Sequence, residues 1–146
     1  MTEKGARRAV WRVLLAIYLV LTGIVVAWPN AWAVNRAVVY VWQIGVTNGW
    51  YHPSGFSPEQ FAVVLNVLLF IPPVLLAAAS FPRVRVGWWV LAAGLGSCLV
   101  EFAQLIGGSR DATIVDIASN TGGALLGALI VAGWRRARGV GSRSTS

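Results

Sequence analysis

The feature that most constrains this chain is the scarcity of charge along its middle. Residues 13–134 contain only eight charged side chains, which are Arg36, Glu59, Arg83, Arg85, Glu101, Arg110, Asp111 and Asp116. Over all 146 residues, 57% are hydrophobic and 12% are charged, against about 25% charged in a typical soluble domain. A soluble fold of this size needs a polar surface that this chain cannot supply, and a disordered chain would be far less apolar. We therefore expect a single integral membrane domain.

The remaining positive charge is concentrated at the two ends of the chain. Four basic residues precede the first apolar run and four follow the last one: Lys4, Arg7, Arg8 and Arg12, then Arg135, Arg136, Arg138 and Arg143. Basic clusters beside apolar segments are typical of cytoplasmic anchors that meet anionic lipid. A nucleic-acid-binding protein would instead combine basic and aromatic residues on one folded face. The net charge of +7 therefore does not indicate a nucleic-acid partner.

Four apolar stretches are long enough to cross about 30 Å of hydrocarbon as helices. They cover residues 10–28, 60–81, 86–106 and 112–134. The second contains Pro72 and Pro73, and a kink near mid-membrane is expected there. The sequence thus predicts an all-α, polytopic membrane bundle over residues 10–134. A basic cytoplasmic N-terminus at 1–9 and a basic, disordered cytoplasmic tail at 135–146 would flank it.

Residues 31–50 are apolar enough to be a fifth span, so we counted positive charges under both topologies. With four spans, ten basic residues face the cytoplasm and only Arg36 and Arg110 lie outside, whereas five spans give a split of about five against six. The positive-inside rule therefore favours four spans in the inner (plasma) membrane, with both termini cytoplasmic. Polar residues of the 31–50 segment gather on one side of a helix, as in a helix lying on the outer interface: Asn35, Arg36, Gln43 and Thr47.

The start of the chain also has features of a secretory signal peptide. A basic start and an apolar core are followed by the small-x-small triplet Ala31-Trp32-Ala33. The uninterrupted apolar core of residues 13–28 is long for a signal peptide, which favours an uncleaved first span. Cleavage after this triplet is the alternative.

Amide and carboxylate side chains of three predicted spans fall at one depth, in the outer leaflet. The set is Asn66, Glu101, Gln104, Asp116 and Asn120, and the short loop before Asp116 adds Arg110. Residues three or four apart share a helix face, so the polar pairs on the third and fourth spans each point in one direction. Because the connecting loop is short, these two spans form a hairpin that can bring Glu101 and Asp116 together.

A carboxylate inside a membrane span needs a reason, because it costs at least about 2.5 kcal/mol at the bilayer centre. One reason is a pocket open to the outside, which would hold a headgroup, a sugar or a proton. The other reason is packing, in which each interhelical hydrogen bond contributes about 0.6 kcal/mol. Deeper along the fourth span, Gly123 and Gly127 are expected to allow close helix packing. The gathering of six polar residues at one depth favours the pocket.

No residue pattern predicts a cofactor or a metal site. The single cysteine, Cys98, excludes a disulfide framework and a cysteine cluster. The single histidine, His52, is expected to be a solvated loop residue beside Pro53. Phosphate-binding loops and nucleophile elbows have characteristic motifs that this sequence does not contain.

The polar residues form three blocks within residues 61–130. These are Asn66-x3-Phe70-x-Pro72, Glu101-x2-Gln104 and Arg110-x5-Asp116-x3-Asn120-Thr121-x-Gly123-x3-Gly127. In these blocks the chain resembles the VanZ-like family of small bacterial membrane proteins. The family usually follows the proline with an aliphatic residue and glycine, where Pro73 and Val74 stand here. The family is named for a protein implicated in low-level resistance to the glycopeptide teicoplanin, so the resemblance implies a multi-span protein of the cell envelope.

The leading functional hypothesis is a polar, outer-facing pocket that binds a lipid headgroup or a lipid-linked glycan. Its binding residues would be Asn66, Glu101, Gln104, Arg110, Asp116 and Asn120. The ligand would be a membrane lipid or a lipid-linked cell-wall intermediate, and glycopeptide tolerance is the phenotype that the resemblance implies. Two alternatives stay open: a membrane-embedded enzyme that uses Glu101 and Asp116 as acid and base, and a structural subunit of an envelope complex.

Overall fold

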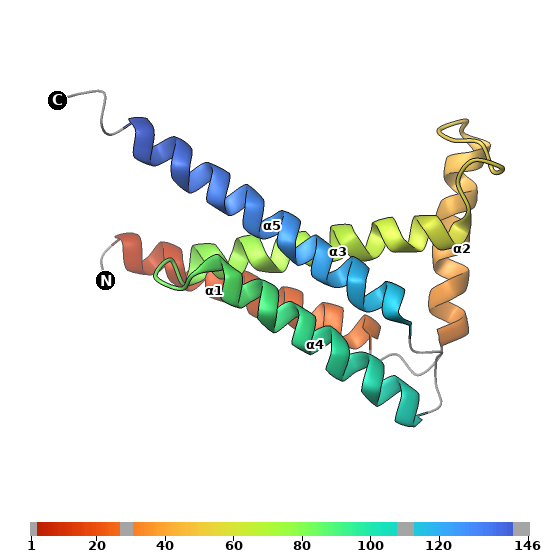
Figure 1. Cartoon of the computed structure of the whole chain (residues 1–146), viewed down its shortest axis with the longest axis horizontal. Coiled ribbons are helices and arrows are strands. Elements are labelled where there is room, and N and C mark those ends of the chain that lie inside the picture. The colour runs from red at the N-terminus through yellow and green to blue at the C-terminus, as the bar shows by residue number, and fades with distance from the viewer. Residues whose placement is uncertain (1–2, 27–30, 108–112, 142–146) are drawn as a thin grey trace.

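The computed structural model describes residues 3–26, 31–107 and 113–141. In these ranges the chain forms helices and no strand; the helices are α1 (Glu3–Val26), α2 (Ala31–Thr47), α3 (Pro58–Ser80), α4 (Val86–Gly107) and α5 (Ile114–Gly141) (Figure 1). Four segments are long and apolar enough to cross a membrane: Gly5–Val25, Pro58–Ser80, Val86–Ala103 and Ile114–Arg138. The prediction of an all-α bundle with four spans is therefore confirmed.

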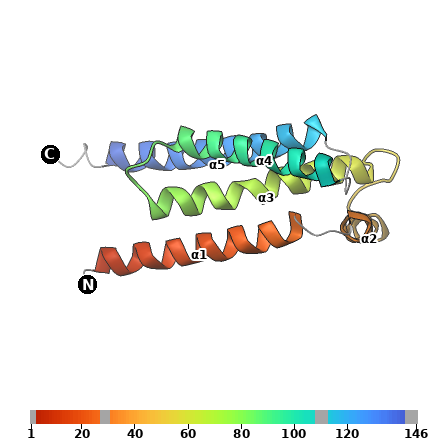
Figure 2. The same cartoon turned by 90° about the horizontal axis from the view of Figure 1, so that it is seen from below.

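Helix α2 is oriented differently from the four long helices. It has 17 residues and lies across one end of the bundle, whereas the other helices run lengthwise (Figures 1 and 2). In Figure 2 it is seen nearly end-on beside the starts and ends of the long helices. This orientation agrees with the helix along the membrane surface that the distribution of positive charge predicts for this segment.

An aromatic cluster fixes α2 against the start of α3. The indole N–H of Trp42 donates to the carbonyl of Phe56 at 2.8 Å, and the hydroxyl of Tyr51 donates to the carbonyl of Trp42 at 2.9 Å. The rings of Tyr51 and Phe56 meet edge-on with their centroids 5.2 Å apart, and Phe61 of α3 packs edge-on against Phe56. The Tyr51 ring fills the space that a side chain at Gly45 would need, so a larger residue at this position would displace the ring.

Helix α3 begins with a capping box, two residues before the predicted start of the span. The N–H of Gln60 donates to Ser57 Oγ at 3.3 Å, and the N–H of Ser57 donates to Gln60 Oε1 at 3.0 Å. Pro58 stands at the first helical position, where its missing N–H has no helical partner to lose. These three residues explain why the helix starts at Pro58.

Helix α3 is the central helix, because it contacts each of the other four. It continues unbroken through Pro72 and Pro73, although Pro73 has no N–H to donate to the carbonyl of Leu69. The hydroxyl of Tyr18 in α1 donates to that carbonyl at 2.7 Å. Helix α1 thus supplies the hydrogen bond that the proline removes, which satisfies a backbone group inside an apolar environment.

Helices α3 and α5 approach each other closely along two glycines of α5. A Cβ atom at Gly123 would overlap the carbonyl oxygen of Val67. A Cβ atom at Gly127 would lie 3.0 Å from the carbonyl oxygen of Ile71 and 3.0 Å from the Cβ of Val74. In a membrane, where lipid tails are as apolar as leucine, such backbone contact through small residues is a main source of helix association.

Helix α5 extends beyond the predicted end of the fourth span. The sequence predicts a span that ends at Trp134 and a disordered tail from residue 135, but the helix continues to Gly141. Arginine and alanine are good helix formers, and the Arg138 guanidinium lies 3.7 Å from the ring centroid of Trp134. The expectation of disorder is therefore wrong for residues 135–141, which form a helical extension of the span.

Candidate functional site

Three of the four spans supply polar side chains at the end of the bundle where α2 lies. Helix α3 begins, α4 ends and α5 begins at this end of the bundle (Figure 1). Polar side chains of these helices and of the residue before α5 form what we call the polar layer: Asn66, Ser97, Glu101, Thr113, Asp116 and Asn120. The layer contains both carboxylates of α4 and α5.

Asp116 joins α5 to α3. Its Oδ1 accepts a hydrogen bond from Asn66 Nδ2 at 2.8 Å, and its Oδ2 accepts one from Thr113 Oγ1 at 2.8 Å. Asn66 and Asp116 are 50 residues apart in sequence, so their bond fixes how the two helices are rotated against each other. Hydrogen bonds to a carboxylate are stronger than those between neutral groups. The Asn66–Asp116 pair is therefore the strongest polar link between these helices in the described layer.

Thr113 links the two acids of the layer. It immediately precedes α5, its Oγ1 accepts from the N–H of Asp116 at 3.1 Å, and its own N–H donates to Glu101 Oε2 at 3.0 Å. In an ordinary capping box, the carboxylate three residues into the motif, here Asp116, would accept that N–H. Glu101 of α4 takes this place, which leaves the Asp116 side chain available to Asn66. The start of α5 therefore depends on a carboxylate of the neighbouring helix.

Asn120 lies one turn deeper and joins α5 to α4. Its Nδ2 donates to Ser97 Oγ at 2.9 Å, whereas its Oδ1 is buried and has no hydrogen-bond partner among the described residues. Turning the amide over would exchange the two atoms and leave the nitrogen without a partner instead. A buried polar atom left in this state costs about 1–3 kcal/mol unless water or a ligand meets it.

Glu101 is the more enclosed of the two acids. It is 8% exposed, whereas Asp116 is half-buried. Within residues 3–26, 31–107 and 113–141, the polar contacts of both acids are made to neutral donors and no cationic side chain pairs with them. Burying a charge is unfavourable unless hydrogen bonds replace the lost water. In the described part of the chain, neutral hydrogen-bond donors therefore replace the water that the two acids lose.

Four of the six residues predicted to bind a ligand belong to the polar layer: Asn66, Glu101, Asp116 and Asn120. For Gln104 only the backbone position in α4 is described. Arg110 lies in the loop between α4 and α5, outside the described residues, and so does Asp111.

Thr113 and Ser97 belong to the layer but are not among the predicted site residues. Thr113 and Asp116 have the Thr-x-x-Asp spacing that is typical of a helix start, and this signal identifies Thr113 in the sequence. Ser97 has no comparable signal, because its pairing with Asn120 depends on how α4 is rotated against α5.

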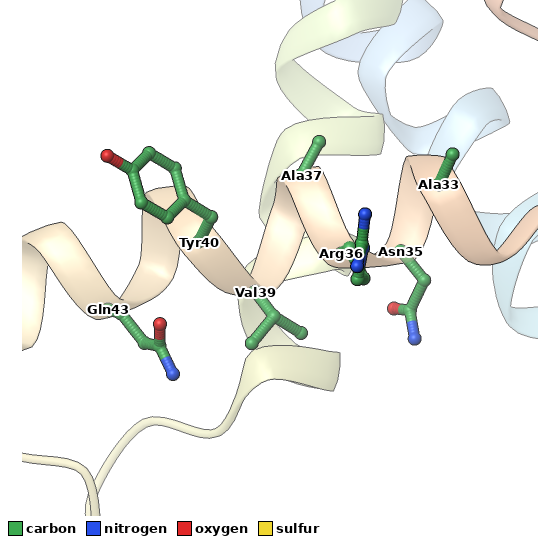
Figure 3. Close-up of a pocket in the computed structure, with 7 residues that line it drawn as sticks. All are labelled: Ala33, Asn35, Arg36, Ala37, Val39, Tyr40 and Gln43. Atoms are coloured by element: carbon green, nitrogen blue, oxygen red, sulfur yellow. The ribbon is translucent and has the colours of Figure 1, made fainter.

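A hollow of about 660 Å³ lies along α2 and includes none of the polar-layer residues. Figure 3 shows the side chains that line it, all of which belong to α2: Ala33, Asn35, Arg36, Ala37, Val39, Tyr40 and Gln43. Because one helix supplies the whole lining, the hollow is an open face of α2. On the same helix, the Arg36 guanidinium lies 3.9 Å from the ring centroid of Trp32. This face of α2 is therefore separate from the polar layer.

Four apolar helices, with acids hydrogen-bonded between them, define the class of this chain: a multi-pass helical membrane protein. The model of the VanZ/LLP1 family matches residues 10–135, and the chain belongs to this family. The matched range covers the whole polar layer as well as α2 and Tyr18 of α1. No curated protein and no solved structure is significantly similar to the chain.

Proposed function

We propose that the polar layer binds the headgroup of a membrane lipid or of a lipid-linked cell-wall intermediate. The observation that carries the proposal is the bonding of Glu101 and Asp116, which is to neutral donors alone among the described residues. Asn120 adds a buried amide atom without a partner in the same part of the chain. A ligand rich in hydroxyl or amino groups complements both features, since it donates to the carboxylates and can meet the unpartnered amide.

The remaining predicted residues fit the same class of ligand. Arg110, in the loop between α4 and α5, would pair with a phosphate through two parallel hydrogen bonds. Gln104, three residues after Glu101 on α4, would add an amide that both donates and accepts. A lipid-linked sugar carries hydroxyl groups next to a phosphate, which matches carboxylates and amides next to an arginine.

The proposal places the polar layer on the outer side of the inner membrane. Both termini would be cytoplasmic, because ten of the twelve basic residues then face inward. In a Cys98→Ala background, Asn48→Cys should react with an impermeant thiol reagent in intact cells, whereas Ala137→Cys should react only after permeabilisation. Both positions are exposed, so access to the reagent reports the side of the membrane. Labelling of Ala137→Cys in intact cells would contradict this topology.

Native mass spectrometry of the purified protein tests the binding proposal. We expect a co-purifying lipid with a sugar, hydroxyl-rich or amino headgroup, and we expect Glu101→Gln and Asp116→Asn to lower its occupancy about tenfold, since each removes a charge-assisted bond. The matched control is Glu59→Gln, which removes an exposed carboxylate at the start of α3. Equal occupancy in all three variants would contradict the proposal.

A packing role is the second candidate, because each oxygen of Asp116 already has a protein donor. In that case the Asp116→Asn variant would lose folding stability but no lipid would be found in the unmodified protein.

An enzyme that uses the two acids would give a third result, because Glu101→Gln would keep lipid bound and stop its conversion. The tolerance to glycopeptides implied by the family's name would follow from binding as a downstream effect.

A further inference from the structure

The end of the bundle opposite α2 carries two adjoining hollows. Helix α1 begins there, and α3 and α5 end there (Figure 1). The larger hollow, about 510 Å³, lies between these three helices, and the smaller one, about 140 Å³, lies against the segment between α3 and α4. Arg8 and Pro82 line both hollows, so the two adjoin each other at these residues.

Arginines dominate the lining of both hollows. We call the set the arginine pocket: Arg7, Arg8, Arg12, Arg83, Arg135 and Arg138. Among the residues that the structure describes, Glu3 is the one acidic residue that lines it. Repulsion among like charges disfavours such a gathering, which an anion between them would relieve. The pocket therefore has the charge of an anion site.

The helix dipoles explain only part of this arrangement. Arg135 and Arg138 stand near the C-terminus of α5, where a positive charge is favourable. Arg7 and Arg8 stand near the N-terminus of α1, where the same dipole is unfavourable to a positive charge. Their presence in the pocket is therefore not accounted for by their own helix.

Unpartnered donors at this end give a second, independent indication. Ser80 lines the smaller hollow and is 0% exposed, and its hydroxyl has no hydrogen-bond partner among the described residues. The indole N–H of Trp89 is also buried without a partner in the described part of the chain, and its ring packs on Phe81 with centroids 5.7 Å apart. Buried polar groups are nearly always hydrogen-bonded. Of these two residues only Ser80 lines a hollow, and its donor without an acceptor beside the arginines indicates a missing anionic acceptor.

The rest of the lining indicates that the anion belongs to a lipid. Trp11 and Trp134 line the larger hollow together with Ala78, Ala79 and Pro82. Indole rings prefer the headgroup level of a membrane, and the small apolar residues are compatible with acyl chains. We propose that the arginine pocket binds the phosphate of an anionic phospholipid. This site is separate from the polar layer, which lies at the other end of the spans.

Titration of the full-length protein in detergent with dihexanoyl-phosphatidylglycerol tests the proposal, with dihexanoyl-phosphatidylcholine as the zwitterionic control. We expect the anionic lipid to bind, and the double variant Arg8→Gln/Arg135→Gln to weaken that binding about tenfold or more, since two charge-assisted contacts are removed. The matched control is Arg85→Gln/Arg136→Gln, which removes the same charge from exposed residues that do not line the hollows. Equal weakening in both double variants would reduce the effect to diffuse surface charge and overturn the proposal.

Two further measurements separate the remaining outcomes. Inorganic phosphate is the probe for a soluble ligand, and if it binds as tightly as the anionic lipid, the lipid assignment is wrong. Ser80→Ala should leave the melting temperature of the lipid-free protein unchanged or higher, because the lost hydroxyl has no partner there, and should weaken binding of the anionic lipid. Unchanged lipid affinity in Ser80→Ala would overturn the placement of the phosphate next to the smaller hollow. This variant also keeps the proposal testable if the arginine pair proves necessary for folding.

Discussion

The two sides of α3 are joined to their neighbours in different ways. On one side, α5 meets α3 backbone to backbone at Gly123 and Gly127, and the Asn66–Asp116 bond adds a polar link. On the other side, α1 is tied to α3 by the bond from Tyr18 to the Leu69 carbonyl. In the apolar window of 18 residues that defines each span, 33% of the residues are buried in α5 but only 6% in α1. Helices α3 and α5 thus form a packed pair, and α1 lies against α3 with most of its surface free.

This contrast shows which sequence features hold a small membrane bundle together. Large apolar side chains do not distinguish protein from lipid, so the abundant leucine and valine of α1 give little drive for association. Small residues and interhelical hydrogen bonds do favour contact between helices over contact with lipid, and α5 has both. Substitutions on the α5 side should therefore cost more stability than equivalent substitutions on the α1 side.

The largest loss in the free energy of unfolding is expected from a substitution at Gly123. A Cβ atom there overlaps the carbonyl of Val67, which belongs to the backbone and cannot move aside cheaply. Gly123→Ala should lower the free energy of unfolding by about 3 kcal/mol, the upper part of the usual cost of overpacking. Unfolding by SDS in mixed micelles measures it. The matched control is Gly122→Ala, because a Cβ at Gly122 meets nothing within 4 Å; an equal loss in both variants would contradict close contact between α3 and α5.

The next effect is expected at Asp116. Asp116→Ala removes the interhelical bond from Asn66 and the local bond from Thr113. At about 0.6 kcal/mol for the first and about 0.5–1.5 kcal/mol for the second, the expected loss is about 1–2 kcal/mol. A double-mutant cycle with Asn66→Ala isolates the link between the helices and should give a coupling energy of about 0.6 kcal/mol. Strict additivity of the two variants would mean that the pair does not hold α3 and α5 together.

A smaller effect is expected on the α1 side. Tyr18→Phe removes the hydroxyl and leaves the Leu69 carbonyl without its donor. We expect a loss of about 0.6 kcal/mol, the average contribution of one interhelical hydrogen bond. The control is Tyr40→Phe, because Tyr40 is 65% exposed on α2. If Tyr18→Phe matched or exceeded the loss from Gly123→Ala, the proposed contrast between the two sides of α3 would be wrong.

The smallest effect is expected at Leu126. This side chain is 46% exposed, although it is the sequence neighbour of the buried Gly127. Because lipid tails replace its contacts, Leu126→Ala should change the free energy of unfolding by less than about 0.5 kcal/mol. The same SDS titration applies, with Gly127→Leu as the disruptive counterpart. Comparable losses in the two variants would show that the faces of α5 are not distinguished by packing.

The spans and the crosswise helix could be predicted because they depend on properties of the linear sequence. The length of an apolar run identifies a membrane helix. The number of spans that leaves most basic residues on the cytoplasmic side of the membrane is the favoured one. Counting residues from the span ends also places Asn66 and Asp116 at one depth, and the structure shows them hydrogen-bonded. The extension of α5 to Gly141 was not predicted, because the apolar run ends at Trp134 while helix propensity continues through the arginines.

The hydrogen-bond partners across neighbouring helices could not be predicted in the same way. The bonds Asn120–Ser97 and Tyr18–Leu69 depend on how each helix is rotated about its own axis. The bond from the Thr113 N–H to Glu101 could not be predicted for the same reason. The local sequence suggests Asp116 as the acceptor, and only the packing of α4 beside the start of α5 makes Glu101 the acceptor instead. A heptad or a spacing rule within one helix contains no information about the rotation of the next helix.

The bond between Tyr18 and the Leu69 carbonyl also has a consequence for biogenesis. A ribosome delivers α1 to the translocon before α3, so the donor is already in the bilayer when the proline-containing helix leaves the protein-conducting channel. The exposed carbonyl of that helix would otherwise enter hydrocarbon without a hydrogen-bond partner, which is unfavourable. In the order of the helices along the chain, the helix with the donor thus precedes the helix with the carbonyl that it satisfies.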